Sequence, residues 1–211
     1  MRNVYENLLY CGDMNDYPPS VQMEHWAVVH ACKDPMHRSL VGYTSKGCPK
    51  DSPHYYFIEK ENRIALNIVD APKPEFFDKR MIDKALDFIE LKLSEGFRVL
   101  VHCNVGESRS ASICLLYLIK HSIIKGETLE DCEAEFLKVY PEYNPGAGIR
   151  GFVKEHFAEY RKHGHAGKKT RSDATKCNEC EYCSSGRCGF YDNAIIADVA
   201  EKQCFPGMEM V

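Results

Sequence analysis

The most informative stretch of this chain is Arg98-Val99-Leu100-Val101-His102-Cys103-Asn104-Val105-Gly106-Glu107-Ser108-Arg109-Ser110. Its first part, residues 98–102, is rich in apolar and β-branched side chains and predicts a buried strand. A helix is expected from about Ser108 to His121. A short loop therefore joins the strand directly to the N-terminus of a helix, which is a position where anions bind.

The loop holds a cysteine and an arginine, Cys103 and Arg109, that are separated by five residues. This length lets the loop curl so that successive backbone N–H groups point inward and form a nest for an oxyanion. Gly106 allows a backbone conformation that other residues resist. Arg109 can reach back with a planar fork that matches two phosphoryl oxygens. The predicted phosphate-binding residues are Asn104, Val105, Gly106, Glu107, Ser108 and Arg109.

The same positive field favours the thiolate of Cys103 over its thiol. Helix N-termini and cationic neighbours lower a cysteine pKa from about 8.5 to roughly 3.5–7.5. A thiolate at the floor of an anion nest can attack phosphorus and form a phosphocysteine intermediate. Ser110 can donate a hydrogen bond that helps the sulfur to leave, and His102 is expected to fix the loop through its ring nitrogens.

Strands alternate with helices around this stretch, which indicates an α/β architecture with a largely parallel central sheet. The segment from Lys33 to Ser52 is rich in Gly, Pro, Ser and Lys and predicts a long loop beside the domain core. Further strands are expected at 8–11, 26–31, 55–58 and 64–69, and further helices at 76–94, 129–139 and 149–161.

The motif His-Cys-x-x-Gly-x-Ser-Arg-Ser at residues 102–110 resembles the signature of dual-specificity protein phosphatases, within the protein-tyrosine-phosphatase superfamily. The likeness covers about residues 4–160. Residues 8–13 look like the first strand of that family, and Asn144-Pro145-Gly146 looks like the segment before its last helix. The resemblance implies a three-layer domain and a phosphatase that needs no metal or other cofactor for catalysis.

Enzymes of this family use an aspartate on an upstream loop as the general acid for the leaving oxygen. The resemblance points to Asp70, which ends a strand and stands before Ala71-Pro72. Asp78 is the competing residue, but it lies at the start of a helix, where it can serve as a cap. A general acid contributes about 10²–10⁴-fold to the rate.

Glu107 departs from the pattern of relatives that act on lipid phosphates, which carry basic residues in this loop. A carboxylate facing the mouth would repel highly phosphorylated headgroups, whereas a carboxylate facing solvent would have no such effect. His30, Cys32 and His54 could be imagined as a metal site, but ordinary core or loop roles are favoured.

Composition excludes several classes of protein. The 211 residues are 44% hydrophobic and 27% charged, which is typical of a soluble globular chain. The net charge of −4 argues against nucleic acid as the main partner. Apolar runs are too short to span a bilayer, and residues 1–7 lack the core of a secretory signal. We therefore expect a cytoplasmic protein that does not bind membranes.

The eleven cysteines are unevenly distributed, because five of them crowd into residues 177–204. Two-residue gaps let thiolates converge on one ion, and four sulfurs suit tetrahedral zinc. An iron–sulfur cluster and a tail of free thiols are the alternatives. Such a zinc site leaves no open position for catalysis, so its role would be structural or partner-binding. The candidate ligands are Cys177, Cys180, Cys183, Cys188 and Cys204.

These observations predict a catalytic domain at 1–162, a linker at 163–176 and a Cys-rich, zinc-binding tail at 177–211. The predicted function is a cysteine-dependent phosphatase that hydrolyses phosphotyrosine, with phosphoserine and phosphothreonine as further substrates, in phosphorylated proteins. The alternatives are a phosphatase of RNA 5′ ends, nucleotides or lipids, and a non-catalytic phosphate-binding module.

Overall fold

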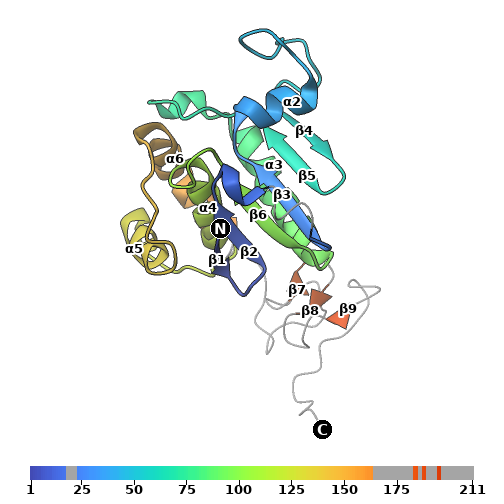
Figure 1. The fold of residues 1–211 in the computed structure, drawn as a ribbon. Helices are drawn as coiled ribbons and strands as arrows, with labels where there is room; N and C mark the ends of the chain where they lie inside the picture. The colour runs from blue at the N-terminus through green and yellow to red at the C-terminus, as the bar shows by residue number, and fades with distance from the viewer. Residues whose placement is uncertain (18–22, 164–182, 185–186, 189–193, 196–211) are drawn as a thin grey trace, which may run out of the picture. The chain divides into compact units, whose positions relative to one another are not determined.

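The computed structural model describes residues 1–17 and 23–163, together with the strand segments 183–184, 187–188 and 194–195 (Figure 1). Within the described residues, no helix has an apolar stretch long enough to cross a bilayer.

The chain forms two compact units, Met1–Gly164 and His165–Val211. The strands described in the second unit pair antiparallel in the order β7-β8-β9. They are β7 (Cys183–Ser184), β8 (Arg187–Cys188) and β9 (Ala194–Ile195).

The first unit is built on a sheet whose strands are β1 (Arg2–Tyr5), β2 (Leu9–Gly12), β3 (Trp26–His30), β4 (Phe57–Lys60), β5 (Arg63–Leu66) and β6 (Arg98–His102). Their order across the sheet is β1-β2-β6-β3-β5-β4. The pairings β2–β6, β6–β3 and β3–β5 are parallel. The outer strands β1 and β4 pair antiparallel with β2 and β5. The prediction of a largely parallel central sheet is therefore confirmed.

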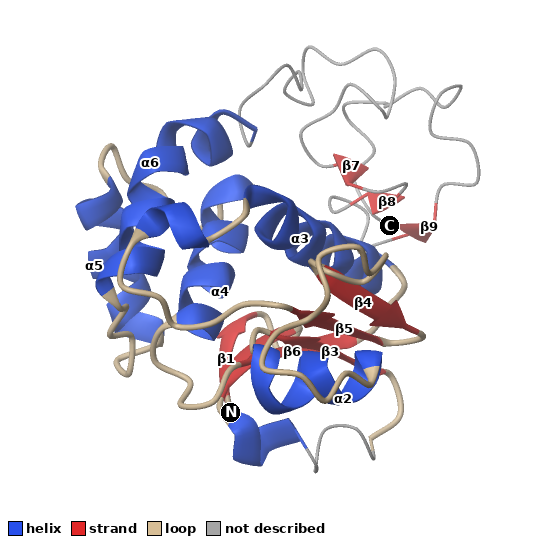
Figure 2. Cartoon of the chain, turned by 90° about the horizontal axis from the view of Figure 1, so that it is seen from above, coloured by secondary structure: helices blue, strands red, loops and turns tan. Residues whose placement is uncertain are grey.

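Long helices of the first unit are α3 (Lys79–Ser94), α4 (Arg109–Lys120), α5 (Leu129–Val139) and α6 (Ala147–His163). They lie on one side of the sheet in Figure 2, with the short helix α2 (Arg38–Val41) on the other side. Helix α3 contacts β3, β5 and β6, whereas α4 contacts β2 and β6 and is covered by α5 and α6. The layered architecture that the sequence indicates is the one observed.

Helix α4 is the centre of the core. Every residue from Arg109 to Ile119 is buried, because the sheet lies against one face of the helix while α3, α5 and α6 contact its other faces. A helix buried all round must be apolar all round, which explains the unbroken apolar run in this part of the sequence. The N-terminus of α4 is consequently held at a fixed place against the end of β6.

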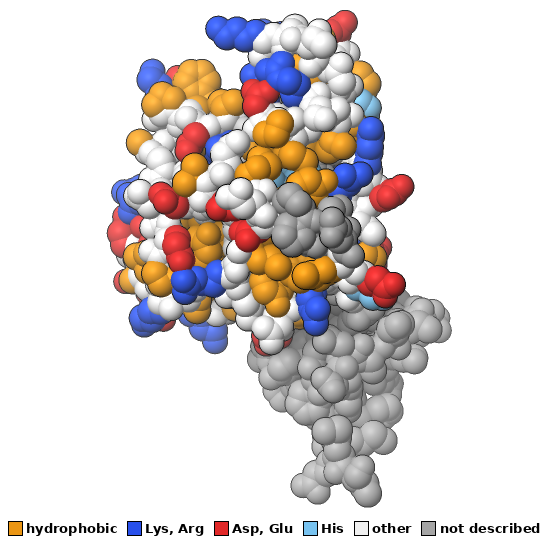
Figure 3. Space-filling model, viewed as in Figure 1, with side chains coloured by type: hydrophobic (Ala, Val, Ile, Leu, Met, Phe, Trp, Pro, Cys, Tyr) orange, Lys and Arg blue, Asp and Glu red, His pale blue; other side chains and the backbone are white. Residues whose placement is uncertain are grey.

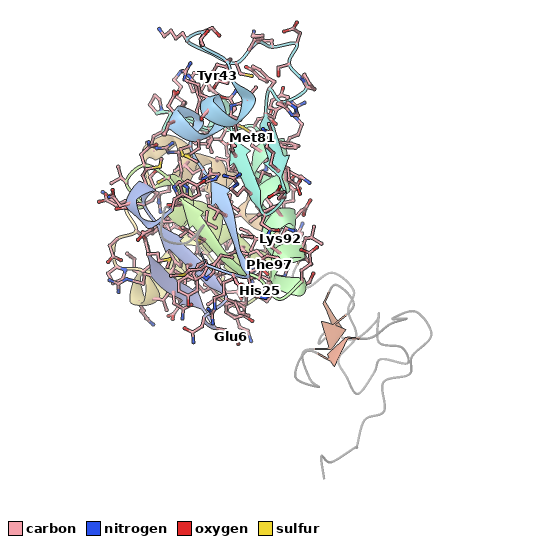
Figure 4. The ribbon with its side chains drawn as sticks, turned by 45° about the vertical axis from the view of Figure 1, so that its right-hand side comes forward. Glu6, His25, Tyr43, Met81, Lys92 and Phe97 are labelled. Atoms are coloured by element: carbon pink, nitrogen blue, oxygen red, sulfur yellow. The ribbon has the colours of Figure 1, made fainter. Side chains whose placement is uncertain are left out.

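The end of the sheet opposite to that N-terminus is closed by aromatic and cationic side chains. Lys92 Nζ lies 5.2 Å from the ring centre of Phe97, and the ring of His25 lies 5.7 Å from the same ring. Figure 4 shows these three residues together at one end of the domain. The functional loop therefore stands at the other, carboxyl end of the parallel strands.

The segment from Lys33 to Ser52 is only partly a loop, contrary to the sequence-based expectation. It begins with a π-helical turn, η2 (Lys33–His37), that continues into α2. Gly42 ends α2 with a left-handed φ of +89°, a conformation that glycine adopts at little cost. His37 is buried, and its Nε2 lies 2.8 Å from the carbonyl oxygen of His54, which fastens this segment.

Helices α5 and α6 are joined by an ion pair around the buried carboxylate of Glu133. Arg150 Nε lies 2.9 Å from Glu133 Oε1, and Arg150 Nη2 lies 2.7 Å from Glu133 Oε2. Tyr143 also donates to Oε1 at 3.2 Å. Together the guanidinium and the phenol supply the donors that the carboxylate loses when it leaves water, which offsets the cost of burying it.

We expect Arg150→Ala to lower the free energy of unfolding by about 1–3 kcal/mol, since it leaves a buried carboxylate without its main donors. Urea unfolding measures this change. Lys154→Ala is the matched control, because Lys154 is an exposed cation on the same helix, 3.8 Å from Glu130, and its loss should cost about 0.5 kcal/mol or less. Equal stability of the two variants would contradict the importance of this ion pair.

Candidate active site

The loop of residues 103–108 joins the end of β6 to the start of α4. In the sheet, β6 lies between β2 and β3, and His102 is in register with Gly12 on one side and His30 on the other. The loop therefore stands at the carboxyl ends of three neighbouring parallel strands, which is where α/β folds place their ligands.

The sulfur of Cys103 is enclosed by hydrogen-bond donors. Its side chain is only 1% exposed. The backbone N–H of Gly106 donates to Sγ at 3.2 Å. The hydroxyl of Ser110 has three acceptors for its one proton: Sγ at 3.3 Å and the carbonyls of Gly12 at 3.2 Å and Gly106 at 3.1 Å. Burial opposes ionisation, but the donors from Ser110 and Gly106 and the charge of Arg109 together hold the pKa of Cys103 below its ordinary value. The surroundings of Cys103 therefore favour its thiolate over its thiol.

Arg109 is held by main-chain carbonyls. Its side chain is buried, and Nη1 donates to the carbonyls of Ala31 at 3.2 Å and Ile68 at 3.4 Å. Nη2 donates to Asn104 Oδ1 at 2.8 Å. The third nitrogen, Nε, has no partner among the described residues. A buried guanidinium N–H without an acceptor is unfavourable, so an anionic oxygen in the loop would satisfy it.

The loop conformation depends on Gly106. Its φ is +93°, and a Cβ at this position would lie 3.2 Å from the carbonyl oxygen of Gly12. The carbonyl of Gly106 accepts from the hydroxyl of Tyr140 at 3.2 Å and from Cys11 Sγ at 3.8 Å. These contacts fix the peptide that joins Gly106 to Glu107, while the N–H of Gly106, in the preceding peptide, faces the sulfur.

Asp70 lies beside the loop and is linked to it through Ser108. The hydroxyl of Ser108 donates to Asp70 Oδ1 at 3.1 Å and accepts from the backbone N–H of Gly146 at 3.0 Å. Asp78, the competing aspartate, caps α3 instead: it accepts from the N–H of Arg80 at 3.0 Å and pairs with the guanidinium of Arg80. This geometry favours Asp70 as the acid.

Glu107 and Val105 turn outward from the loop. Val105 is 65% exposed. Both residues line a hollow of about 250 Å³ beside the thiol site, together with Asp13, Asp16 and Glu142. The four carboxylates outnumber the two cations of this side of the loop, since Arg2 pairs with Glu142 and the terminal ammonium of Met1 pairs with Asp16. On the face shown in Figure 3, acidic and basic side chains are interspersed, with no broad basic region.

Both ring nitrogens of His102 make contacts, one with the start of the loop and one with His30. Its Nδ1 lies 3.2 Å from the carbonyl oxygen of Cys103, and its Nε2 lies 2.5 Å from Nδ1 of His30. Both imidazoles are fully buried. The pairing with His30 was not expected from the sequence, where His30 is assigned an ordinary role in the core.

The other contacts that sequence reasoning missed are main-chain and long-range. The carbonyls that hold Arg109 follow the ends of β3 and β5, and residue type gives no signal for them. Tyr140 follows α5 and belongs to no recognisable sequence motif, so its contact with the loop could not be predicted. Asn104 was expected to contribute its backbone N–H, but its side chain also bridges Arg109 to η2, since Nδ2 donates to the carbonyl of Asp34 at 3.0 Å.

The predicted zinc ligands fall largely outside the described residues. Cys177, Cys180 and Cys204 lie there, whereas Cys183 and Cys188 are described only as parts of β7 and β8. Within the described part of the chain, no group of three or more His, Cys, Asp or Glu is arranged to hold a metal ion.

Comparison with known proteins agrees with this geometry. The family model of the dual specificity phosphatase catalytic domain matches residues 36–136, which include the whole loop. The chain is 33% identical over 132 residues to a probable dual specificity protein phosphatase from Dictyostelium discoideum, covering 61% of this chain and 39% of that protein. The chain is therefore similar to dual-specificity phosphatases over the part that holds the loop.

Two further proteins of that family show the same similarity. Dual specificity protein phosphatase 18 from Rattus norvegicus is 33% identical over 94 residues, covering 44% of this chain and 43% of that protein. This chain therefore spans about two-fifths of the length of either relative. The crystal structure of DUSP15 matches with a TM-score of 0.55 and 20% identity over 78% of this chain and 92% of that one, a likeness of fold.

We expect Ser110→Ala to raise the pKa of Cys103. The depressed pKa depends on donors to the thiolate, and a hydrogen bond to a charged group contributes about 1.5–3 kcal/mol, or roughly one to two pKa units. The acid limb of kcat/KM should therefore move to higher pH by that amount, and activity below the new pKa should fall.

The pH dependence of iodoacetamide alkylation at Cys103 measures the same pKa without turnover. Ser112→Ala is the matched control, because it removes a buried hydroxyl from the same helix that makes no contact with Cys103 in the described structure. An unchanged alkylation profile in Ser110→Ala would contradict the assignment of Ser110 as a donor to the thiolate.

Proposed function

We propose that this protein is a phosphatase that hydrolyses phosphotyrosine, and also phosphoserine and phosphothreonine, in proteins through a phosphocysteine intermediate on Cys103. The observation that carries the proposal is the buried Arg109, whose Nε has no partner among the described residues and which stands beside a thiol whose pKa is depressed despite its burial. The nucleophile and the anion clamp thus share one enclosed loop.

In the first step, the thiolate of Cys103 attacks phosphorus in line with the leaving oxygen. The S–P bond forms as the P–O bond to the substrate breaks, and the departing oxygen takes a proton from Asp70. Arg109 and the loop N–H groups bind the equatorial oxygens, on which charge is spread in the transition state. Ser108 holds the Asp70 carboxyl at the loop through its 3.1 Å hydrogen bond.

In the second step, water attacks the phosphocysteine and gives its proton to the Asp70 carboxylate. The P–S bond breaks, and the electron pair returns to sulfur. The hydroxyl of Ser110, 3.3 Å from Sγ, stabilises the leaving thiolate. Inorganic phosphate is released, and both Cys103 and Asp70 return to their starting protonation states.

Protein substrates are favoured over polyphosphorylated ones by the charge around the loop. Glu107 stands at the rim of the loop with Asp13, Asp16 and Glu142 beside it. These carboxylates would repel lipid headgroups, RNA 5′ ends or nucleotides that carry several phosphates. A non-catalytic phosphate-binding module is disfavoured, because such a module does not need Cys103, Ser110 and Asp70 together.

We expect Asp70→Asn to lower kcat by about 10²–10⁴-fold on phosphotyrosine and phosphothreonine peptides, because it removes the proton donor. The loss should be smaller on para-nitrophenyl phosphate, whose leaving group needs less protonation. Asp78→Asn is the matched control: it alters a helix cap, should cost about 1 kcal/mol of stability or less and should leave the dependence on the leaving group unchanged.

Steady-state kinetics on these substrates, with a phosphoinositide and a nucleoside triphosphate alongside, tests the proposal. Cys103→Ser should abolish turnover, and EDTA should leave wild-type turnover unchanged. Hydrolysis confined to the phosphoinositide or the nucleotide would contradict the protein substrate. An Asp70→Asn variant with the wild-type dependence on the leaving group would remove Asp70 from the mechanism.

We further propose the division of the chain into a catalytic domain at 1–162, a linker at 163–176 and a structural zinc-binding tail at 177–211. Spacing of the cysteines supports the tail. The register of β7 and β8 adds to it, because Cys183 stands opposite Cys188 in an antiparallel pair. Opposite residues in such a pair have Cα atoms only about 4.5–5.5 Å apart, which suits two ligands of one ion.

We expect the full chain, purified under reducing conditions, to contain one equivalent of zinc by elemental mass spectrometry. Cys183→Ser and Cys188→Ser should each lose it, whereas Cys103→Ser should retain it. Hydrolysis of para-nitrophenyl phosphate should be the same with and without zinc, since the tail supplies no catalytic group. Zinc that persists in both tail variants, or its absence from the wild type, would refute this site.

The proposal extends to location and partners. A thiolate nucleophile must stay reduced, and the six cysteines described in the first unit are all free thiols. Both features fit the reducing cytoplasm. The tail at 177–211 is the proposed surface for a protein partner in addition to the phosphorylated substrate.

A further inference from the structure

Two buried histidines meet beneath the functional loop. His30 on β3 and His102 on β6 are in register on neighbouring strands. Their ring centres are 4.8 Å apart at an interplanar angle of 85°, and the closest atoms are His30 Nδ1 and His102 Nε2 at 2.5 Å. Both side chains are completely buried. The proton between the two nitrogens must therefore be assigned to one of the rings.

The hydrogen bonds around the pair determine that assignment. The carbonyl of Cys103 can only accept, so His102 Nδ1 carries a proton and donates to it at 3.2 Å. In a neutral His102, Nε2 is then an acceptor, and His30 Nδ1 must be the donor. A cationic imidazolium on either side is disfavoured, because burial lowers the pKa of both His30 and His102.

Aromatic and charged side chains surround the pair. Burial, the larger effect, lowers the pKa of His102, although Asp16 and Asp13 raise it. Tyr17 packs its ring edge-on against His30 at 4.6 Å and stacks on His102 at 5.6 Å. Arg63 donates to the hydroxyl of Tyr17 at 2.9 Å and brings a positive charge to this side of the pair. His30 Nε2, the far nitrogen, has no partner among the described residues, so only the Nδ1 side of His30 is engaged.

We propose that His30 is a positioning residue for the phosphate-binding loop, acting through His102 on the first peptide of the loop. The donor of His30 selects the His102 tautomer whose Nδ1–H holds the carbonyl of Cys103. That carbonyl and the N–H of Asn104 belong to one planar peptide and point in opposite directions. Holding the carbonyl at His102 therefore aims the N–H of Asn104 away from His102, toward the loop interior.

Loss of the His30 donor would change the chemistry of Cys103. When the donor of His30 is lost, Nε2 of His102 is left as a buried acceptor without a partner, and the other tautomer becomes accessible. In that tautomer, Nδ1 and the carbonyl of Cys103 are two acceptors facing each other, so the first peptide of the loop must rotate. Rotation brings a carbonyl dipole toward the thiolate and disfavours it. This inference rests on the proposed function only for its kinetic consequences.

Three substitutions separate a positioning role from simple filling of the core. His30→Asn keeps an N–H donor near the place of Nδ1, whereas His30→Gln moves it to the place of Nε2. His30→Leu removes it and keeps an apolar side chain of comparable bulk. Alkylation of Cys103 by iodoacetamide across pH, located by peptide mass spectrometry, gives the thiol pKa of each variant without requiring turnover.

We expect His30→Asn to retain the wild-type alkylation pKa and at least half of kcat. His30→Gln and His30→Leu should raise the alkylation pKa and lower kcat about tenfold, with KM changed less, because loop geometry counts most in the transition state. Nitrogen-15 NMR of the imidazoles should show His30 and His102 both as Nδ1–H tautomers in the wild type, and a change at His102 in the Gln variant.

Wild-type alkylation and kcat in His30→Gln would overturn the inference, and so would equal losses in the Asn and Gln variants, which would mean that His30 only fills space. An Nε2–H tautomer at His102 in the wild type would overturn it directly, even if His30→Leu fails to fold. Failure of the proposed function is a different result: no phosphate ester would be hydrolysed although the alkylation series behaves as expected.

Discussion

The structure depends on the stabilisation of a negative charge on a sulfur whose side chain is only 1% exposed to solvent. Burial by itself disfavours the thiolate of Cys103 strongly, and the hydrogen bonds from Ser110 and Gly106 with the charge of Arg109 must outweigh that cost. Each donor is itself fixed by other parts of the fold. Gly106 is fixed by contacts to its carbonyl, Arg109 is held by carbonyls that follow two strands, and Ser110 belongs to the first turn of the most buried helix. A dianion such as a phosphate ester binds best where these same donors converge, so one arrangement activates the nucleophile and binds the substrate.

This requirement explains why the loop stands where it does. Strand β6 lies inside the sheet between β2 and β3, and α4 is covered on all sides, so neither end of the loop can shift without disturbing the core. Acidic groups stay at the rim, where Asp70 is exposed and is connected through Ser108, and where Glu107 faces a hollow instead of the sulfur. Separating the anionic groups from the thiolate keeps the pKa of Cys103 low.

Much of this could be predicted from sequence because the decisive features are local. The bounds of β6 and α5 agree with the periodic pattern to the residue, and Cys103, Arg109 and Ser110 are related by one short loop. Contacts that depend on the register between strands could not be predicted from the sequence. The contact of His30 with His102 can be predicted only if β3 is known to pair with β6, and the anchoring of Arg109 involves carbonyls that any residue could supply.

Strand β1 was missed because Arg2-Asn3-Val4-Tyr5 is a short edge strand with one buried side chain, too few for an alternation signal. The helix α2 was missed because Pro, Gly and Lys around it indicate a loop, whereas burial of His37 stabilises the turn.

Trapping the covalent intermediate tests directly whether Cys103 is the nucleophile. The full chain would be mixed with a phosphotyrosine peptide, quenched in acid during turnover and digested, and the peptide containing Cys103 would be analysed by mass spectrometry. We expect one phosphoryl group on Cys103, absent before substrate is added and absent in Cys103→Ala. Steady turnover with Cys103 unmodified at every quench time, or with the phosphoryl group on another residue, would contradict it.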